Sequence, residues 1–131
     1  MEFHHVGIAV RSIEETTNLY VDMGYHFTGT LVDLVQNVRI AFLKREDSPL
    51  LELVQPVDKT SPVSNILKRA GVSAYHFCYE TADLQKSMED FENRDFKVLI
   101  EPVQAVAFNN RRISFLYHIE IGLIELLEKI K

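Results

Sequence analysis

Hydrophobic and polar positions along the chain follow two periods, and together they predict short strands alternating with amphipathic helices. Residues 3–10 are mostly apolar and predict a strand. Ser12 with Glu15 three positions later has the spacing of a capping box, so a helix is expected to begin near Ser12 and to end at Gly24. The remaining strands of the first half are expected at about residues 25–32, 38–44 and 50–54.

A linker helix is predicted between the two halves of the chain. Ser61 and Pro62 begin it, it runs through Ala70, and Gly71 ends it, because proline is favoured just inside a helix start and glycine just beyond its end. The second half then repeats the element order of the first, with a strand at about 74–81, a helix at 82–93, and strands at about 96–101, 111–117 and 122–127.

The two halves also resemble each other residue by residue, which indicates an internal duplication. Arg39 matches Arg112 and Glu52 matches Glu125, and both pairs are 73 residues apart (112 minus 39, and 125 minus 52). Five further identical pairs share this offset: Ile40/Ile113, Phe42/Phe115, Leu43/Leu116, Leu50/Leu123 and Leu53/Leu126. The sequence therefore predicts an α+β fold in which two pseudo-twofold-related βαβββ modules form a curved mixed sheet. We expect a single domain over residues 1–131, with module one at about 1–57, the linker helix at about 61–71 and module two at about 73–131.

Composition narrows the functional classes. A chain of 131 residues with 47% hydrophobic and 25% charged residues is typical of one globular domain. Fourteen basic against 19 acidic residues give a net charge of −5, which disfavours broad nucleic-acid binding. The single cysteine excludes an internal disulfide, and neither a secretory signal nor an apolar run of about 18 residues is visible. We expect a cytoplasmic protein with no membrane segment.

Two glutamates lie within otherwise apolar strands. Glu52 is flanked by Leu51 and Leu53, and Glu125 by Ile124 and Leu126. A buried carboxylate without a partner costs several kcal/mol, so each glutamate is expected to have a cationic partner or to be protonated. Either the two matched arginines, Arg39 and Arg112, or a bound metal ion could supply the positive charge.

Two histidines recur in the same way. His5 and His76 are 71 residues apart and lie in the first strand of each half. If the modules pair around a pseudo-twofold axis, both histidines and both glutamates converge on one cavity, and their donor atoms suit Zn, Ni, Co, Fe or Mn. Residues that lack such a match are expected to be structural or solvent-facing: His4, His26, His118 and Cys78.

These residues resemble the vicinal oxygen chelate superfamily, which includes glyoxalases and bleomycin resistance proteins, and within it the methylmalonyl-CoA epimerase-like, glyoxalase-related branch. The resemblance covers nearly the whole chain, and it is carried by residues 4–10, 36–43, 52–56, the Ser61-Pro62 helix start, 75–77 and 122–126. Residues 103–110 depart from this resemblance, because many epimerases are rich in glycine in this segment, whereas residues 103–110 of this chain contain no glycine.

The resemblance implies that His5, Glu52, His76 and Glu125 bind one divalent ion (Zn, Ni, Co or Mn) in a metal cup of the sheet. It implies an isomerase that moves a proton next to a carbonyl through a metal-stabilised enediolate. Glu125 is then the expected general base, and Glu52 is the expected second acid/base. The implied substrate is a small carbonyl or acyl-thioester compound, and the implied assembly is a homodimer.

Three alternatives stay open. A glyoxalase I-like lyase would use the same four ligands. An extradiol dioxygenase would use two histidines and one carboxylate on Fe(II), which makes a second carboxylate unexpected. The fold also supports non-enzymatic modules that bind small molecules or antibiotics, although such modules commonly lack the full ligand set.

Overall fold

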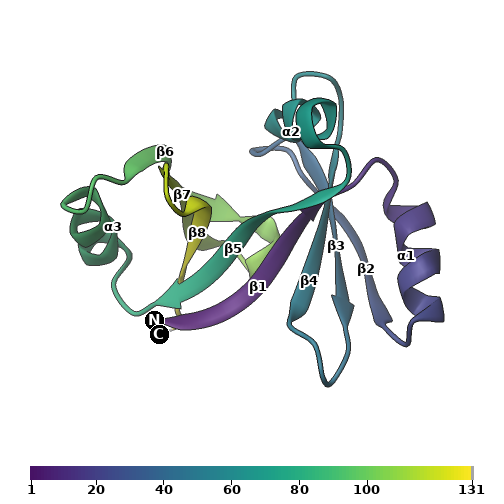
Figure 1. The fold of residues 1–131 in the computed structure, drawn as a ribbon. Coiled ribbons are helices and arrows are strands. Elements are labelled where there is room, and N and C mark those ends of the chain that lie inside the picture. Colours follow the sequence, from purple (N-terminus) through teal and green to yellow (C-terminus); the bar gives the residue numbers. More distant parts are fainter. Residues whose placement is uncertain (131) are drawn as a thin grey trace. The chain divides into compact units, whose positions relative to one another are not determined.

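The computed structural model describes residues 1–130, and the chain divides into two compact units (Figure 1). The N-terminal unit spans His5–Tyr75. The C-terminal unit consists of Met1–His4 together with the chain from His76 onward. The expectation that residues 1–131 form a single domain stays a prediction.

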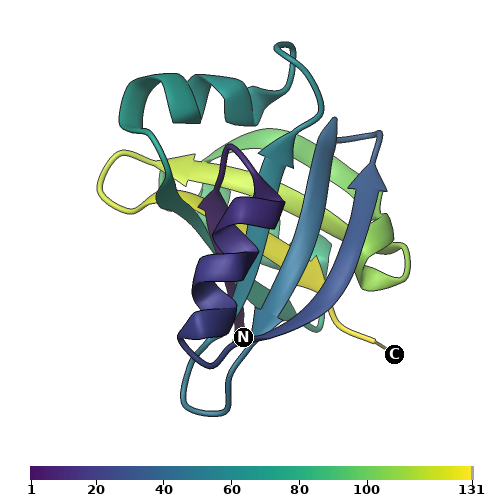
Figure 2. The ribbon, with the colours of Figure 1, turned by 90° about the vertical axis from the view of Figure 1, so that its right-hand side faces the viewer.

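The N-terminal unit is a mixed four-stranded sheet with strand order β2-β3-β4-β1. The β2–β3 and β3–β4 pairs are antiparallel, and β1 pairs with β4 in parallel. Helix α1 lies along one face of this sheet (Figures 1 and 2). The elements are β1 (Glu2–Ala9), α1 (Ile13–Asp22), β2 (His26–Asp33), β3 (Val38–Lys44), β4 (Leu50–Pro56) and α2 (Pro62–Ala70).

The C-terminal unit repeats this arrangement, with strand order β6-β7-β8-β5, a parallel β5–β8 pair and two antiparallel pairs. Its elements are β5 (Ser73–Thr81), α3 (Leu84–Glu92), β6 (Lys97–Ala105), a 3₁₀ helix (Val106–Phe108), β7 (Arg111–His118) and β8 (Gly122–Glu128). The predicted α+β class and the repeated βαβββ order are confirmed. Within residues 1–130, no helix has the length and apolar character needed to cross a membrane.

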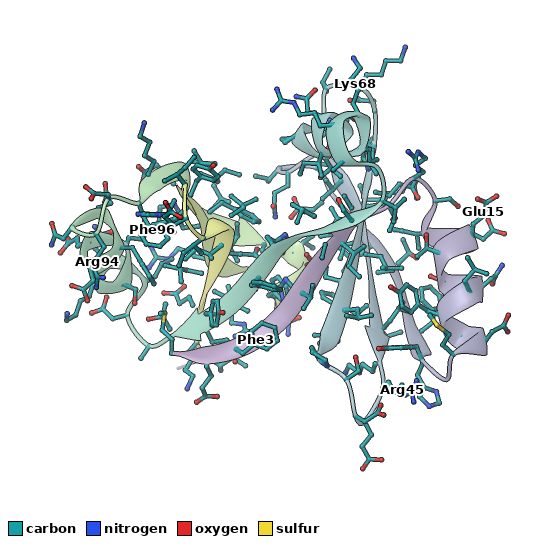
Figure 3. All side chains as sticks on the ribbon, viewed as in Figure 1. Phe3, Glu15, Arg45, Lys68, Arg94 and Phe96 are labelled. Atoms are coloured by element: carbon teal, nitrogen blue, oxygen red, sulfur yellow. The ribbon has the colours of Figure 1, made fainter. Side chains whose placement is uncertain are left out.

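Each unit has its own hydrophobic core between its helix and its sheet. Leu43 and Leu53 are fully buried in the core beneath α1, where each contributes about 2–3 kcal/mol. Phe96 lies in the core beneath α3 (Figure 3). Because strand side chains alternate between the two faces, the core side of β4 takes Leu51 and Leu53 and leaves Glu52 on the opposite face.

The helix starts follow the predicted capping residues. The Ser12 hydroxyl accepts a hydrogen bond from the backbone N–H of Glu15 at 3.1 Å. The Ser61 hydroxyl accepts one from Val63 at 3.3 Å. Each cap satisfies one of the N–H groups that the first helical turn leaves without an intrahelical partner.

The end of β6 differs from the expectation. The strand was expected at about residues 96–101, whereas the structure gives β6 as Lys97–Ala105. The structure continues β6 to Ala105, since it is an edge strand whose pairing with β7 shifts register on both sides of Ile100. The 3₁₀ helix that follows was not predicted, and it ends at Asn109 in the left-handed conformation (φ 55°).

Candidate functional site

A buried His–Glu pair lies in the N-terminal unit, on the sheet face opposite α1. His5 comes from β1 and Glu52 from β4, and the distance from His5 Nε2 to Glu52 Oε1 is 3.4 Å. The two residues are 0% and 3% exposed. In the parallel register Gly7 lies opposite Glu52, and His5 is two residues before Gly7, hence on the same face of β1.

The C-terminal unit contains an equivalent pair. His76 comes from β5 and Glu125 from β8, with 3.2 Å between His76 Nε2 and Glu125 Oε1. Both residues are buried, and Cys78 takes the place opposite Glu125 that Gly7 takes opposite Glu52. The four predicted ligands therefore form two pairs of the same composition, one in each unit.

A phenylalanine accompanies each pair. Phe42 on β3 is the cross-strand partner of Glu52, and its ring meets the His5 ring at 6.3 Å with an interplanar angle of 75°. Phe115 on β7 is the partner of Glu125, and its ring meets the His76 ring at 5.2 Å and 87°. These phenylalanines are an identical pair at the 73-residue offset, but the sequence pattern alone predicted no role for them.

The arginines that could have neutralised the glutamates take other positions. Arg112 forms a 3.0 Å ion pair with Glu128. It lies three residues before Phe115 on β7, and its side chain is therefore on the other face of the strand. Arg39 pairs across from Gln55 and is exposed, again on the face of β3 opposite Phe42. Pairing of the glutamates with these arginines is therefore not the arrangement found.

The other histidines occupy structural or exposed positions, as predicted. His26 is exposed. The His118 ring packs on Phe96 at 4.9 Å, and the His4 ring packs edge-on to Phe108 at 5.3 Å. Cys78 is a free, buried cysteine.

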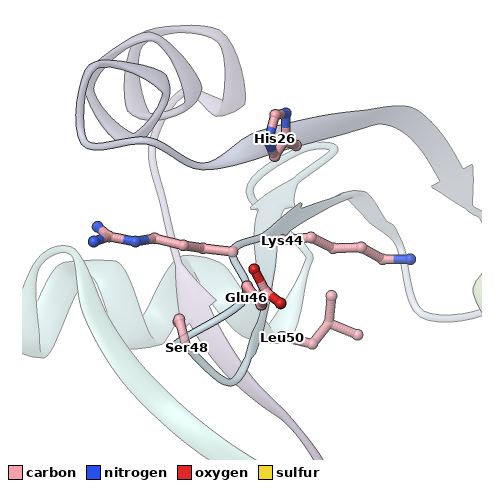
Figure 4. Close-up of a pocket in the computed structure, with 6 residues that line it drawn as sticks. His26, Lys44, Glu46, Ser48 and Leu50 are labelled. Atoms are coloured by element: carbon pink, nitrogen blue, oxygen red, sulfur yellow. The ribbon is translucent and has the colours of Figure 1, made fainter.

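A shallow pocket of about 360 Å³ lies at the β3–β4 hairpin end of the N-terminal unit (Figure 4). The Arg45 guanidinium there is held by Asp47 at 2.7 Å and by the Met23 carbonyl at 2.6 Å. The pocket carries charges of both signs and therefore favours no single charged ligand. Its lining residues are His26, Lys44, Arg45, Glu46, Ser48 and Leu50.

The donor chemistry of the two pairs fits a divalent ion of the first transition series. Each pair offers one imidazole nitrogen and carboxylate oxygens, donors that suit Zn, Ni, Co and Mn. Both histidines direct Nε2 toward a carboxylate oxygen, so the donor atoms of each pair already lie close together. Burial among apolar side chains also makes a compensating positive charge favourable.

The chain is similar over most of its length to known proteins. It is 28% identical over 127 residues to the uncharacterized protein YqjC of Bacillus subtilis, covering 95% of this chain and 89% of the relative. It is 24% identical over 132 residues to the mitochondrial methylmalonyl-CoA epimerase of Dictyostelium discoideum, covering 98% and 78%.

A solved structure agrees. The methylmalonyl-CoA epimerase of Streptomyces coelicolor, in a variant bound to 2-nitronate-propionyl-CoA, superposes with a TM-score of 0.86 at 27% identity, covering 100% of this chain and 99% of that one. A family model described as Glyoxalase/Bleomycin resistance protein/Dioxygenase superfamily matches residues 4–115. The chain therefore belongs to the Glyoxalase/Bleomycin resistance protein/Dioxygenase superfamily, the vicinal oxygen chelate group of proteins.

Proposed function

We propose that this protein is a metal-dependent isomerase of the epimerase type, which moves a proton at the carbon next to a carbonyl group. The observation that carries the proposal is the repetition of one buried His–Glu pair in each unit, with Nε2 to Oε1 distances of 3.4 and 3.2 Å. In this proposal His5, Glu52, His76 and Glu125 hold one divalent ion between them. The relatives named as methylmalonyl-CoA epimerases support the reaction class.

The proposed chemistry assigns a different task to each carboxylate. When bound, the ion acts as a Lewis acid that polarises the substrate carbonyl and makes the neighbouring C–H more acidic. A Glu125 carboxylate oxygen accepts the proton from one face of that carbon, and the bond electrons move toward the carbonyl. The Glu52 carboxyl returns a proton to the opposite face, so the configuration inverts, and exchange with solvent restores the two carboxyl groups.

The substrate in this proposal is a small acyl thioester, by analogy with the named epimerases. The surroundings of both pairs are apolar, since Leu50 and Val54 flank Glu52 and Leu123 and Leu127 flank Glu125 on the same strand faces. Such walls limit access of water, which preserves the basicity of a carboxylate and protects a carbanion-like species. The homodimer and the cytoplasmic location implied by the family resemblance stay predictions. Light scattering measures the molar mass in solution and so tests the homodimer.

The first test is metal content. Protein purified without a chelator is expected to contain one divalent ion per chain, and the His5→Ala, Glu125→Ala double variant is expected to lose it. A matched control replaces an exposed histidine and an exposed glutamate, His26→Ala with Glu120→Ala, and should retain the ion. A metal-free wild-type protein that takes up no divalent ion would remove the proposal and favour a binding module.

The second test is isotope exchange. The metal-loaded protein is expected to introduce deuterium from D₂O into methylmalonyl-CoA at the carbon between the two carbonyl groups. Mass spectrometry of the recovered thioester measures the uptake. If metal-loaded protein gives no exchange, methylmalonyl-CoA is excluded as substrate, and other carbonyl compounds are then tested in the same assay.

A further inference from the structure

Two phenylalanines occupy equivalent places beside the two His–Glu pairs. Phe42 lies directly across the β3–β4 ladder from Glu52, and Phe115 lies directly across the β7–β8 ladder from Glu125. Each ring also contacts the histidine of its own pair edge to face, at 6.3 Å for His5 and 5.2 Å for His76. Each unit therefore builds the same arrangement of His, Glu and Phe from three neighbouring strands.

The arrangement restricts how the imidazole can turn. The torsion that rotates a histidine ring about its Cβ–Cγ bond has broad minima, so the ring plane is set mainly by its neighbours. A phenyl ring at a nearly perpendicular angle, 75° for Phe42 and 87° for Phe115, favours one plane because ring edges and faces carry opposite partial charges. In that plane Nε2 of each histidine faces a carboxylate oxygen.

We propose that Phe42 and Phe115 are positioning residues that orient His5 and His76 for metal binding. This inference rests on the proposed metal site and adds to it the residues that prepare the ligands before the ion arrives. Neither phenylalanine has an atom that binds a divalent ion, so each acts through its histidine. Phe115 has the stronger effect, since its ring is nearer to the histidine and is buried, whereas Phe42 is half-buried.

A purely structural role for these rings makes a different prediction. Phe96 provides the comparison, because its ring packs edge to face on Phe91 at 4.8 Å in the core beneath α3 and contacts neither ligand histidine. A core phenylalanine replaced by leucine loses stability without changing a metal site. A positioning phenylalanine replaced by leucine loses metal affinity as well, because leucine fills space but imposes no ring orientation.

The test compares Phe115→Leu, Phe42→Leu and the control Phe96→Leu. Cobalt(II) is the probe, its dissociation constant is measured by competition with a chromophoric chelator, and its visible absorption spectrum reports the ligand geometry. We expect Phe115→Leu to weaken Co²⁺ binding by about tenfold and to change the spectrum, as loss of a group that orients a ligand histidine typically does. Phe42→Leu is expected to show a smaller loss, and Phe42→Tyr, which keeps the ring, to bind as wild type does.

The control separates affinity from stability. Phe96→Leu is expected to lower the melting temperature and to leave both the Co²⁺ dissociation constant and the spectrum unchanged. A folded Phe115→Leu protein with wild-type affinity and spectrum overturns the inference while leaving the proposed function intact. If Phe115→Leu does not fold, Phe42→Leu and Phe42→Tyr decide: equal affinities in these two variants overturn it. A wild-type protein that binds no Co²⁺ overturns the proposed function and this inference together.

Discussion

At the scale of single residues, the free-energy cost of burying a carboxylate means that the two glutamates need a compensating positive charge. Glu52 and Glu125 are 3% and 2% exposed, and a desolvated carboxylate without compensation costs several kcal/mol. A nearby imidazole can compensate it in two ways, by carrying a proton or by sharing a metal ion with it. The same pair recurs in both halves, and this favours the ion. One shared ion needs ligands from both halves, whereas a proton on the histidine of one half needs no equivalent pair in the other half.

The two glutamates are expected to differ in their effects on the reaction. Glu125→Gln keeps an oxygen donor but cannot accept a proton, so deuterium uptake into the substrate should fall by about 10²–10⁴-fold. Glu52→Gln should keep uptake but lose inversion, because the proton then returns only on the face served by Glu125. Chiral analysis of the recovered thioester distinguishes the two outcomes, and equal effects on uptake and inversion in both variants would contradict the assignment.

Thr17 offers a residue-scale prediction about stability. It is 7% exposed on α1, and among the described residues its hydroxyl oxygen has no hydrogen-bond partner. Valine has nearly the same shape without the polar atom, so Thr17→Val is expected to raise the free energy of unfolding by about 1 kcal/mol in urea denaturation. Thr16→Val is the control, since Thr16 is half-buried and should change stability little. A destabilised Thr17→Val protein would show that the hydroxyl contributes favourably.

At the scale of elements, local chemistry predicted helix starts better than strand ends. Ser12 and Ser61 cap their helices as expected, because a side-chain acceptor two or three residues before a free N–H group is a purely local feature. The end of β6 depends on pairing with β7 and on the register shifts on both sides of Ile100, and neither can be predicted from nearby residues. The Phe–His contacts likewise depend on strands distant in sequence, although the matched offset identified the residues.

The cap of α3 gives the prediction for this scale. The Asp83 carboxylate accepts a hydrogen bond from the backbone N–H of Lys86 at 3.0 Å. Asp83→Ala is expected to lower the free energy of unfolding by about 1 kcal/mol. The control is Asp22→Ala at the last residue of α1, where removing a negative charge near the helix C-terminus should leave stability unchanged or slightly higher. Thermal unfolding of the two variants measures the contrast, and equal shifts would count against a specific capping effect.

At the scale of the whole molecule, the duplication was the feature that the sequence predicted best. The offset of 73 residues located Glu52 and Glu125, and the structure places them on equivalent strands, β4 and β8, each opposite a phenylalanine on the neighbouring strand. The sequence did not predict that Met1–His4 belongs with the C-terminal unit, because that depends on packing of Phe3 against Phe77 and Tyr79. Local patterns assign residues to elements, whereas only tertiary contacts assign them to units.

The ends of the described chain are tied within the C-terminal unit, and this tie predicts a pH dependence. The Lys129 ammonium lies 2.6 Å from the Glu2 carboxylate, and its hydrogen bond and charge lower the pKa of Glu2 below its usual 4.5. The same contact raises the pKa of Lys129 above its usual 10.5. The stabilisation from Glu2 is present above pH 4.5 and is lost as pH falls through the lowered pKa, and that from Lys129 is present below pH 10.5 and is lost as pH rises through the raised pKa.

Glu2→Gln is therefore expected to lower the melting temperature slightly at pH 7 and to match the wild type below the lowered pKa of Glu2. The effect is small because both side chains are exposed. Glu101→Gln, an exposed glutamate on β6, is the control. A difference between Glu2→Gln and wild type that persists unchanged at pH 2 would contradict the assigned origin.

The most direct test of the proposed metal site is a crystal structure of the metal-loaded protein with anomalous diffraction measured at the absorption edge of the bound ion. Binding of one ion by all four residues predicts one anomalous peak per chain, bonded at about 2.0–2.2 Å to His5, Glu52, His76 and Glu125 together. A shared site would be contradicted by two separate peaks or by one peak bound to only one of the pairs. It would also be contradicted by the absence of a peak, with each histidine hydrogen-bonded only to its own glutamate.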